Sequence, residues 1–173
     1  MEAYNVIIII FGIIILFCFV FLSFYNRLKI LQKKVLHQYF NVEKYVEEFN
    51  QELKKVPIFL ENNFEHEIDY INDLKKTSTE IEKSSDQKEV IALIKKLKDA
   101  ATSFSNLEST YSWLGKEKDY VQLKNNLTTG WNHLEYSLDS YNKAVLKYHA
   151  IDRNKFYFFV KKLGRFPQYY RYE

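Results

Sequence analysis

The chain has 173 residues, of which 47% are hydrophobic, and its formal net charge is +3. That charge is too small to indicate a nucleic-acid partner, and the single cysteine, Cys18, excludes both an internal disulfide and a zinc site built from several thiolates. With only 4 Gly and 2 Pro the chain has few turns, so its Lys, Glu, Leu and Ile predict an all-α fold of long helices.

The N-terminal segment is apolar enough to cross a membrane. Residues 3–26 carry no charged side chain, and fifteen of the residues from Val6 to Leu22 are Ile, Val, Leu or Phe. About 24 helical residues span roughly 36 Å, against a hydrocarbon core of about 30 Å. Inserting them gains on the order of 5–9 kcal/mol as an upper bound. The sequence therefore predicts a transmembrane anchor over residues 1–25, with Tyr4 and Tyr25 at its two interfaces.

Two other interpretations of this segment fit less well. A cleaved signal peptide would have a basic start, a shorter apolar run and small residues at the cleavage site. Here the chain begins Met1-Glu2-Ala3, and the apolar run ends in Phe21-Leu22-Ser23-Phe24. A core helix of a soluble protein would carry polar residues on one face, and this segment has none. We therefore expect an uncleaved signal anchor.

Charges on either side of the span predict its orientation. Only Glu2 and the amino terminus precede it, whereas basic residues follow it. Lys and Arg close to a span favour the cytoplasmic side. The prediction is a single-pass protein of the cell membrane, in contact with the lipid bilayer, with its soluble domain in the cytoplasm. The basic residues at this interface are Arg27, Lys29, Lys33 and Lys34.

The first helix of the soluble part is predicted over residues 26–56. Apolar residues recur there at every seventh position, as in a coiled coil or an amphipathic helix, and no Pro or Gly interrupts them before Pro57. We expect the membrane helix to continue into it without a break. Pro57 should end or kink this helix and suits the first turn of the next. The stripe consists of Leu28, Val35, Val42, Phe49 and Val56.

Three further helices are predicted, over residues 58–83, 86–114 and 119–152. Asp86 and Glu89 have the spacing of a capping box, and Gly115 stands where a helix commonly ends. Gly130, inside the last helix, indicates either a close approach of a neighbouring helix or a bend. Four stripes joined by short loops predict an antiparallel up-down four-helix bundle over residues 26–152.

In an up-down bundle the fourth helix runs back towards the membrane. We therefore expect the C-terminal tail, residues 153–173, to lie close to the bilayer. Basic and aromatic residues occur together there, a combination favoured at a membrane interface. In a second interpretation, which does not exclude the first, the aromatic residues close the open end of the bundle core. The predicted interface residues of the tail are Phe156, Phe158, Phe159, Lys161, Lys162 and Arg165.

The sequence contains no pattern typical of catalysis. His66-Glu67 starts like a metalloprotease motif, but residue 70 is tyrosine, so the second His ligand is missing. Glycine-rich phosphate loops and repeated Glu-x-x-His metal motifs are absent too. We therefore expect neither an enzyme nor a bound cofactor or metal. Asn142, in the last helix, is a candidate for a polar contact between helices that fixes their register.

Several of these features together resemble the LemA family. They are the N-terminal span, the exit Tyr25-Asn26-Arg27-Leu28, and a last helix with Tyr141-Asn142 followed by Val145 and Tyr148. The family carries Tyr-Asn-x-x-Val-x-x-Tyr-Asn there, and His149 replaces its second Asn. Gly164-Arg165-Phe166 is also similar to the family's tail. The resemblance implies a membrane-anchored helical bundle, widespread in bacteria and without an agreed activity.

The sequence thus predicts a non-catalytic interaction or scaffold module with an unidentified membrane or envelope protein as its partner. The alternative is a single-span sensor or transducer that couples the anchor helix to a signalling partner. Self-association into a homo-oligomer through the exposed bundle faces is a further option.

Overall fold

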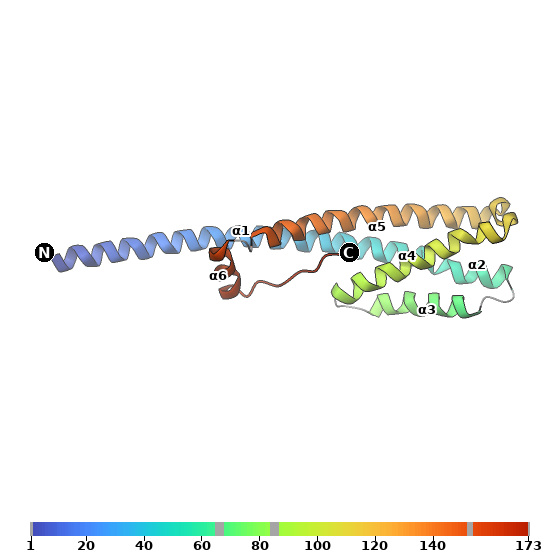
Figure 1. Ribbon diagram of the computed structural model, residues 1–173, viewed down its shortest axis with the longest axis horizontal. Coiled ribbons are helices and arrows are strands. Elements are labelled where there is room, and N and C mark those ends of the chain that lie inside the picture. The colour runs from blue at the N-terminus through green and yellow to red at the C-terminus, as the bar shows by residue number, and fades with distance from the viewer. Residues whose placement is uncertain (1, 65–67, 84–86, 152–153, 173) are drawn as a thin grey trace. The chain divides into compact units, whose positions relative to one another are not determined.

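The computed structural model describes residues 2–64, 68–83, 87–151 and 154–172, and every element assigned in these ranges is a helix (Figure 1). The predicted all-α class is therefore confirmed for the described part of the chain. The elements are α1 (Glu2–Leu53), α2 (Lys55–Asn63), α3 (Ile68–Lys83), α4 (Gln87–Thr110), the 3-10 helix η1 (Ser112–Lys116), α5 (Lys118–Ala150) and α6 (Lys155–Leu163).

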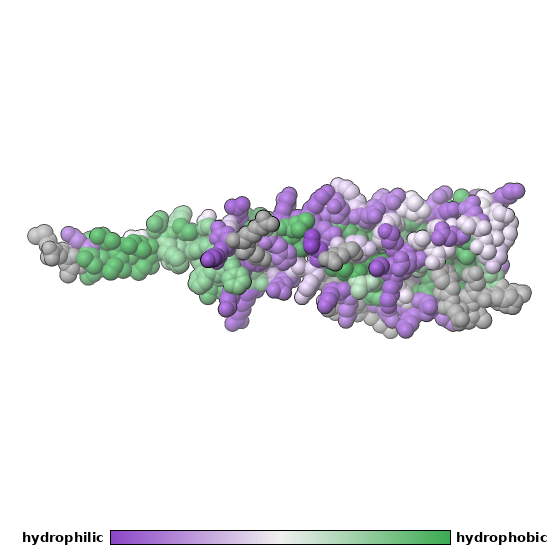
Figure 2. All heavy atoms as spheres, viewed as in Figure 1, coloured by the Kyte–Doolittle hydropathy of each residue, from purple (hydrophilic) through white to green (hydrophobic). Residues whose placement is uncertain are grey.

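The first part of α1 is apolar on all sides. An 18-residue window in it has a mean hydropathy of 3.3, and none of that window is buried inside the protein. Side chains from Tyr4 to Val20 are all exposed, and Figure 2 shows hydrophobic residues gathered over this end of the helix. By length and composition, this helix can cross a membrane, as the sequence predicted. α1 then continues past residue 26 to Leu53.

The chain divides into two compact units, and α1 and α5 each contribute to both. The first unit comprises residues 1–38 and 142–171. Its core takes side chains from three helices. Leu28 and Val35 of α1 are fully buried, seven residues apart as the stripe predicted, together with Val145 of α5 and Val160 of α6.

The second unit comprises residues 39–141 with 172–173. Within it α3 packs against α4 and α2, and α4 packs against η1. The parts of α1 and α5 in this unit meet through aromatic pairs, among them Phe49 with Trp131 at a centroid distance of 5.9 Å. The fully buried side chains of this unit include Phe49, Leu53, Leu60, Ile94, Leu97, Phe104, Leu114, Tyr120 and Leu134.

The junction of α1 and α2 lies close to the predicted boundary at Pro57. Lys54 keeps helical backbone angles, and its amide still donates to the Asn50 carbonyl at 3.0 Å. Pro57 is the third residue of α2, in the first turn, where its missing N–H removes no bond within that helix. The chain therefore re-starts a helix here with little disruption.

The helix predicted over residues 58–83 is interrupted. α2 ends at Asn63, whose side-chain amide donates to the Phe59 carbonyl at 2.8 Å, and Phe64 is extended with φ −137° and ψ 125°. The Phe64 ring packs against Tyr111 and Trp113 at 4.9 and 5.8 Å. This long-range aromatic contact has no signature in the local pattern. His66 and Glu67, which the sequence does not support as a metal site, lie outside the described residues.

The predicted helix over 86–114 ends earlier, at Thr110. Tyr111 leaves the helical region, with φ −121° and ψ 80°, and η1 follows, so Gly115 lies inside a 3-10 turn and not directly after α4. Leu114 is fully buried, so it belongs to the core although it lies in this 3-10 turn and not in α4. Asp86 of the expected capping box and Ser84 and Ser85 of the preceding loop lie outside the described residues.

Gly130 lies at a close approach of α5 to α1. A Cβ atom added there would be 3.2 Å from Phe49 Cδ2 and 3.9 Å from Phe49 Cα. Of the two interpretations of Gly130 left open by the sequence, the close approach is the one this geometry supports.

The tail contains α6, which was not predicted from the sequence. Asn154 caps its start by accepting a hydrogen bond from the Phe156 amide at 2.9 Å. At its end, Arg165 has a positive φ of 49°, and the Phe166 amide donates to the Lys161 carbonyl at 3.1 Å. This is the geometry of a Schellman motif, with arginine in the position that glycine usually takes.

Candidate functional site

The predicted interface residues of the tail lie against α1 in the first unit. Phe156 contacts Phe24 at a centroid distance of 4.8 Å and Phe17 at 6.1 Å. Tyr157 lies 4.3 Å from Phe24. Because Phe17 belongs to the apolar stretch of α1, α6 lies at the C-terminal end of the helix segment that can span a membrane (Figure 1).

α6 has two different faces. Tyr157 and Val160 are buried, which corresponds to the role of closing a core. Phe158 is 61% exposed, Phe159 48% and Leu163 58%, so the opposite side presents large apolar groups. The buried face of α6 thus contributes to a core, whereas contact of the exposed face with a membrane stays a prediction.

The exit of α1 is held to the tail by aromatic and cationic contacts. The half-buried Tyr25 ring lies 5.3 Å from Phe166. Lys29 Nζ lies 5.8 Å from the Tyr25 centroid and 5.3 Å from the Phe166 centroid, within the range of a cation–π interaction. Tyr4, at the other end of the apolar stretch, is 70% exposed.

The predicted basic interface residues are exposed with one exception. Lys161 is half-buried, and its Nζ lies 4.1 Å from the centroid of the Tyr148 ring. It therefore holds α6 to α5. The exposed basic residues of the predicted set are Arg27, Lys29, Lys33, Lys34, Lys162 and Arg165.

The segment after α6 is fixed to α5 by two hydrogen bonds. The Tyr148 hydroxyl donates to the Pro167 carbonyl at 2.9 Å, and His149 Nε2 lies 2.9 Å from the Tyr169 carbonyl oxygen. A carbonyl oxygen only accepts hydrogen bonds, so Nε2 must carry a hydrogen. This holds whether the His149 ring is neutral or protonated on both nitrogens. Burial raises the pKa of Tyr169, whose ring packs on Tyr148 at 5.2 Å. Tyr148 and His149 thus anchor the tail to α5.

Sequence reasoning missed the α1 residues that receive α6. Phe17, Phe24 and Leu31 follow one another at intervals of seven residues. The same seven-residue repeat therefore runs from the apolar stretch into the soluble part of the helix, and it could have indicated these residues. Asn142, the predicted polar contact, is half-buried on α5, and its register role stays a prediction. A buried polar contact between helices lies elsewhere: Asn50 Nδ2 of α1 donates to the Ser78 carbonyl of α3 at 3.1 Å.

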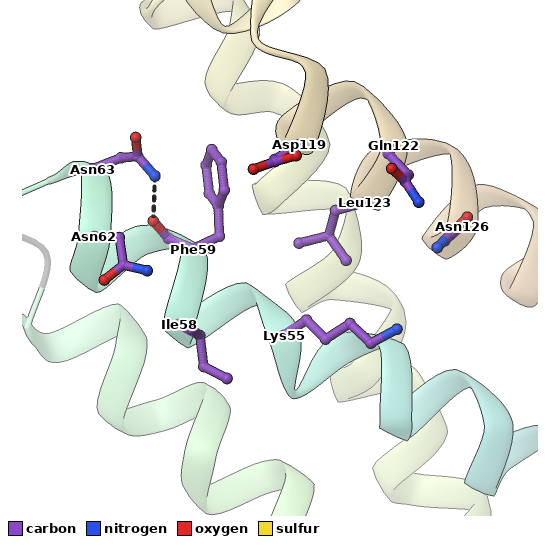
Figure 3. A pocket seen from close by; sticks show the side chains of 9 residues that line it. All are labelled: Lys55, Ile58, Phe59, Asn62, Asn63, Asp119, Gln122, Leu123 and Asn126. Carbon is purple, nitrogen blue, oxygen red and sulfur yellow. Dashed lines mark hydrogen bonds between the residues drawn. The ribbon is translucent and has the colours of Figure 1, made fainter.

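A groove in the second unit is the other candidate site (Figure 3). It has a volume of about 450 Å³ and lies between α2 and the first turns of α5. The polar lining is rich in amides, and Phe59, Leu123 and the 60% exposed Ile58 supply apolar surface. Amides both donate and accept, so this lining suits neutral hydrogen-bonding groups such as a peptide backbone. The polar residues are Lys55, Asn62, Asn63, Asp119, Gln122 and Asn126.

Two lining residues of this groove meet at Glu52. Lys55 Nζ donates to Glu52 Oε1 at 2.5 Å, and Asn126 Nδ2 donates to Oε2 at 3.0 Å. Burial raises the pKa of Glu52, but these hydrogen bonds outweigh it and the net pKa is lowered. Glu52 therefore ties α1 to α5 beside the groove. Among the residues described, no group of three His, Cys, Asp or Glu side chains could hold a metal ion.

Comparisons with protein-family models, with curated proteins and with solved structures found no match to this chain.

Proposed function

We propose that this protein is a non-catalytic interaction module anchored in the cell membrane by residues 1–25. The observation that carries this proposal is the contrast within one helix. Residues 4–20 expose every side chain, whereas the later part buries Leu28, Val35 and Val42. Leaving a large apolar side chain in water costs about 1.5–3 kcal/mol relative to burying it, so an apolar stretch of this length needs a bilayer around it.

Residues 39–141 act in this proposal as the water-facing domain, an antiparallel four-helix bundle in the cytoplasm. The contact of α3 with α4 and the pairing of Tyr45 with His133 across α1 and α5 support it. The same range has nineteen acidic and thirteen basic residues, a balance that disfavours nucleic acid. The bacterial LemA family remains the resemblance that fits this architecture, and it supplies no activity.

The partner we propose is a membrane or envelope protein that offers an extended segment to the groove between α2 and α5. Affinity capture of the tagged full chain from gently solubilised membranes, followed by mass spectrometry, tests this. We expect reproducible proteins that are lost with the double variant Ile58→Lys and Gln122→Arg and kept with Lys95→Gln on the exposed face of α4. Capture of the same proteins by both variants would exclude the groove, and recovery of further copies of this chain would indicate a homo-oligomer.

Sidedness has its own test. In a Cys18→Ser background, Lys95→Cys should resist a membrane-impermeant maleimide in intact cells and react once the membrane is opened. Asn5→Cys, at the other end of the apolar stretch, should react in intact cells. The reverse pattern would place the domain outside the cytoplasm.

The continuous course of α1 from the apolar stretch to Leu53 favours a second candidate, a transducer. Inserting two glycines after Gln38 distinguishes an interaction module from a transducer. A module would keep its captured partners and its cellular function, because only tethering matters. A transducer would keep the partners and lose the function, because a rotation or tilt no longer passes along the helix.

A further inference from the structure

We propose that the outward face of α6, together with the segment of α1 that leaves the membrane, binds anionic phospholipid headgroups. These headgroups belong to the leaflet on the side where α1 leaves the bilayer. This inference deepens the proposed membrane anchoring and rests on it.

The charges of the first unit are strongly one-sided. Outside the apolar stretch, residues 26–38 and 142–171 contain twelve Lys and Arg residues and a single acidic residue, Asp152. Every basic side chain described there is exposed except Lys161. Residues 39–141 have the opposite balance, so the modest net charge of the chain hides a basic unit. Basic residues close to a bilayer are attracted to anionic lipids.

The apolar side chains of α6 are arranged as a membrane-facing stripe. Phe156, Phe159 and Leu163 have the three- and four-residue spacing that places them along one side of a helix. Phe156 begins this stripe and touches Phe17 inside the apolar stretch of α1. Phe159 and Leu163 continue the stripe and are exposed, which directs them to the medium that surrounds that stretch.

Basic residues border this apolar stripe. Lys155 and Lys162 are exposed and seven residues apart on α6, and the exposed Arg165 follows its end. Lys and Arg rich helices with Phe and Leu on the neighbouring face lie in the interfacial plane of membranes, and their binding rises with the fraction of anionic lipid. Charge complementarity thus selects anionic headgroups over zwitterionic ones.

The test uses the full chain reconstituted into phosphatidylcholine vesicles with spin-labelled lipid probes. We expect the protein to enrich spin-labelled phosphatidylglycerol over spin-labelled phosphatidylcholine in its lipid shell, and the enrichment to fall as salt is raised. The triple variant Lys155→Gln, Lys162→Gln and Arg165→Gln should lose at least about half of the enrichment. The matched control Lys76→Gln, Lys95→Gln and Lys118→Gln removes three exposed charges from the second unit and should retain it.

The proposal would be overturned if the two spin-labelled lipids were equally represented in the lipid shell. It would also be overturned if the test and control variants lost the same share of the phosphatidylglycerol enrichment. A depth measurement keeps it falsifiable should the triple variant not fold. In a Cys18→Ser background, a fluorophore on Phe159→Cys should be quenched by lipids with shallow spin labels, whereas one on Lys95→Cys should not. Unquenched label at residue 159 would also overturn it. Alkaline extraction of the vesicles separates the two failures: protein that stays integral without lipid preference refutes this inference alone, and protein that is extracted refutes the anchoring as well.

Discussion

At Gly130, α5 comes so close to α1 that an added Cβ would make a tight contact with Phe49, at 3.2 Å from Cδ2. Phe49, against which an added Cβ would press, is fully buried and also contacts Trp131, so it has little room to move. We expect Gly130→Leu to lower the free energy of unfolding by about 1–3 kcal/mol through overpacking. Thermal unfolding of the full chain in detergent, followed by circular dichroism, measures this.

The control for that substitution is Asn125→Leu, on an exposed position of α5. It adds the same side chain without meeting α1 and should change the unfolding temperature little. Equal effects of the two variants would mean that Gly130 does not mark a close helix contact.

The carboxylate of Glu52 makes stability depend on pH. Hydrogen bonds from Lys55 and Asn126 hold its pKa below the ordinary value in spite of partial burial. A lowered folded-state pKa contributes stability that is present above the unfolded-state pKa and is lost as the pH falls through the folded-state pKa. Because the Lys55 side chain of this ion pair is 56% exposed, we expect Glu52→Gln to cost about 0.2–1 kcal/mol at neutral pH.

The difference between Glu52→Gln and the parent chain should shrink as the pH falls through the acid range in which carboxylates titrate. Unfolding curves at neutral and acid pH measure it, with Glu47→Gln on the exposed side of α1 as the control. A difference that stays constant over this range would contradict the role given to the Glu52 charge.

At the scale of elements, the end of α6 depends on Gly164. A Cβ there would lie 2.5 Å from the Phe166 ring, which is itself packed against Tyr25 and Lys29. Gly164→Ala should therefore loosen the segment after α6. We expect trypsin to cleave after Arg165 at least about fivefold faster, which corresponds to roughly 1 kcal/mol of local destabilisation.

Gly12→Ala is the matched control, because an added Cβ there meets nothing within 4 Å. It should leave the cleavage rate unchanged. If Gly164→Ala were cleaved no faster than Gly12→Ala, the packing of Phe166 would not hold the tail in place.

The elements that the sequence predicted well are those defined by local periodicity. The apolar start of α1, the seven-residue stripe after it and most of α5 follow from spacing alone. The break at Phe64 and the early end of α4 do not, because both depend on the packing of Phe64 against Tyr111 and Trp113, far away in sequence. α6 was missed because it is short and its burial comes from Phe24 of another helix.

For the candidate sites too, local sequence patterns were predictive and contacts between distant residues were not. Composition alone identified the basic and aromatic residues of the tail, but it did not separate Tyr157, which is buried, from Phe158, which is exposed. The groove was not predicted, because its walls come from α2 and α5, and no local pattern records that they meet.

At the scale of the whole molecule, sequence and charge assign different surroundings to different parts of the chain. The apolar start of α1 suits lipid, the basic residues 26–38 and 142–171 suit a charged interface, and the acidic range 39–141 suits water. The proposed lipid interface and the proposed partner-binding role both require a bilayer around the apolar start of α1.

Alkaline carbonate extraction of membranes from cells that express the full chain tests that assignment most directly, with intact-mass measurement of the protein recovered. We predict that the protein stays in the membrane pellet and that its mass includes residues 4–25. Protein released into the supernatant, or a mature form that lacks this segment, would contradict the account.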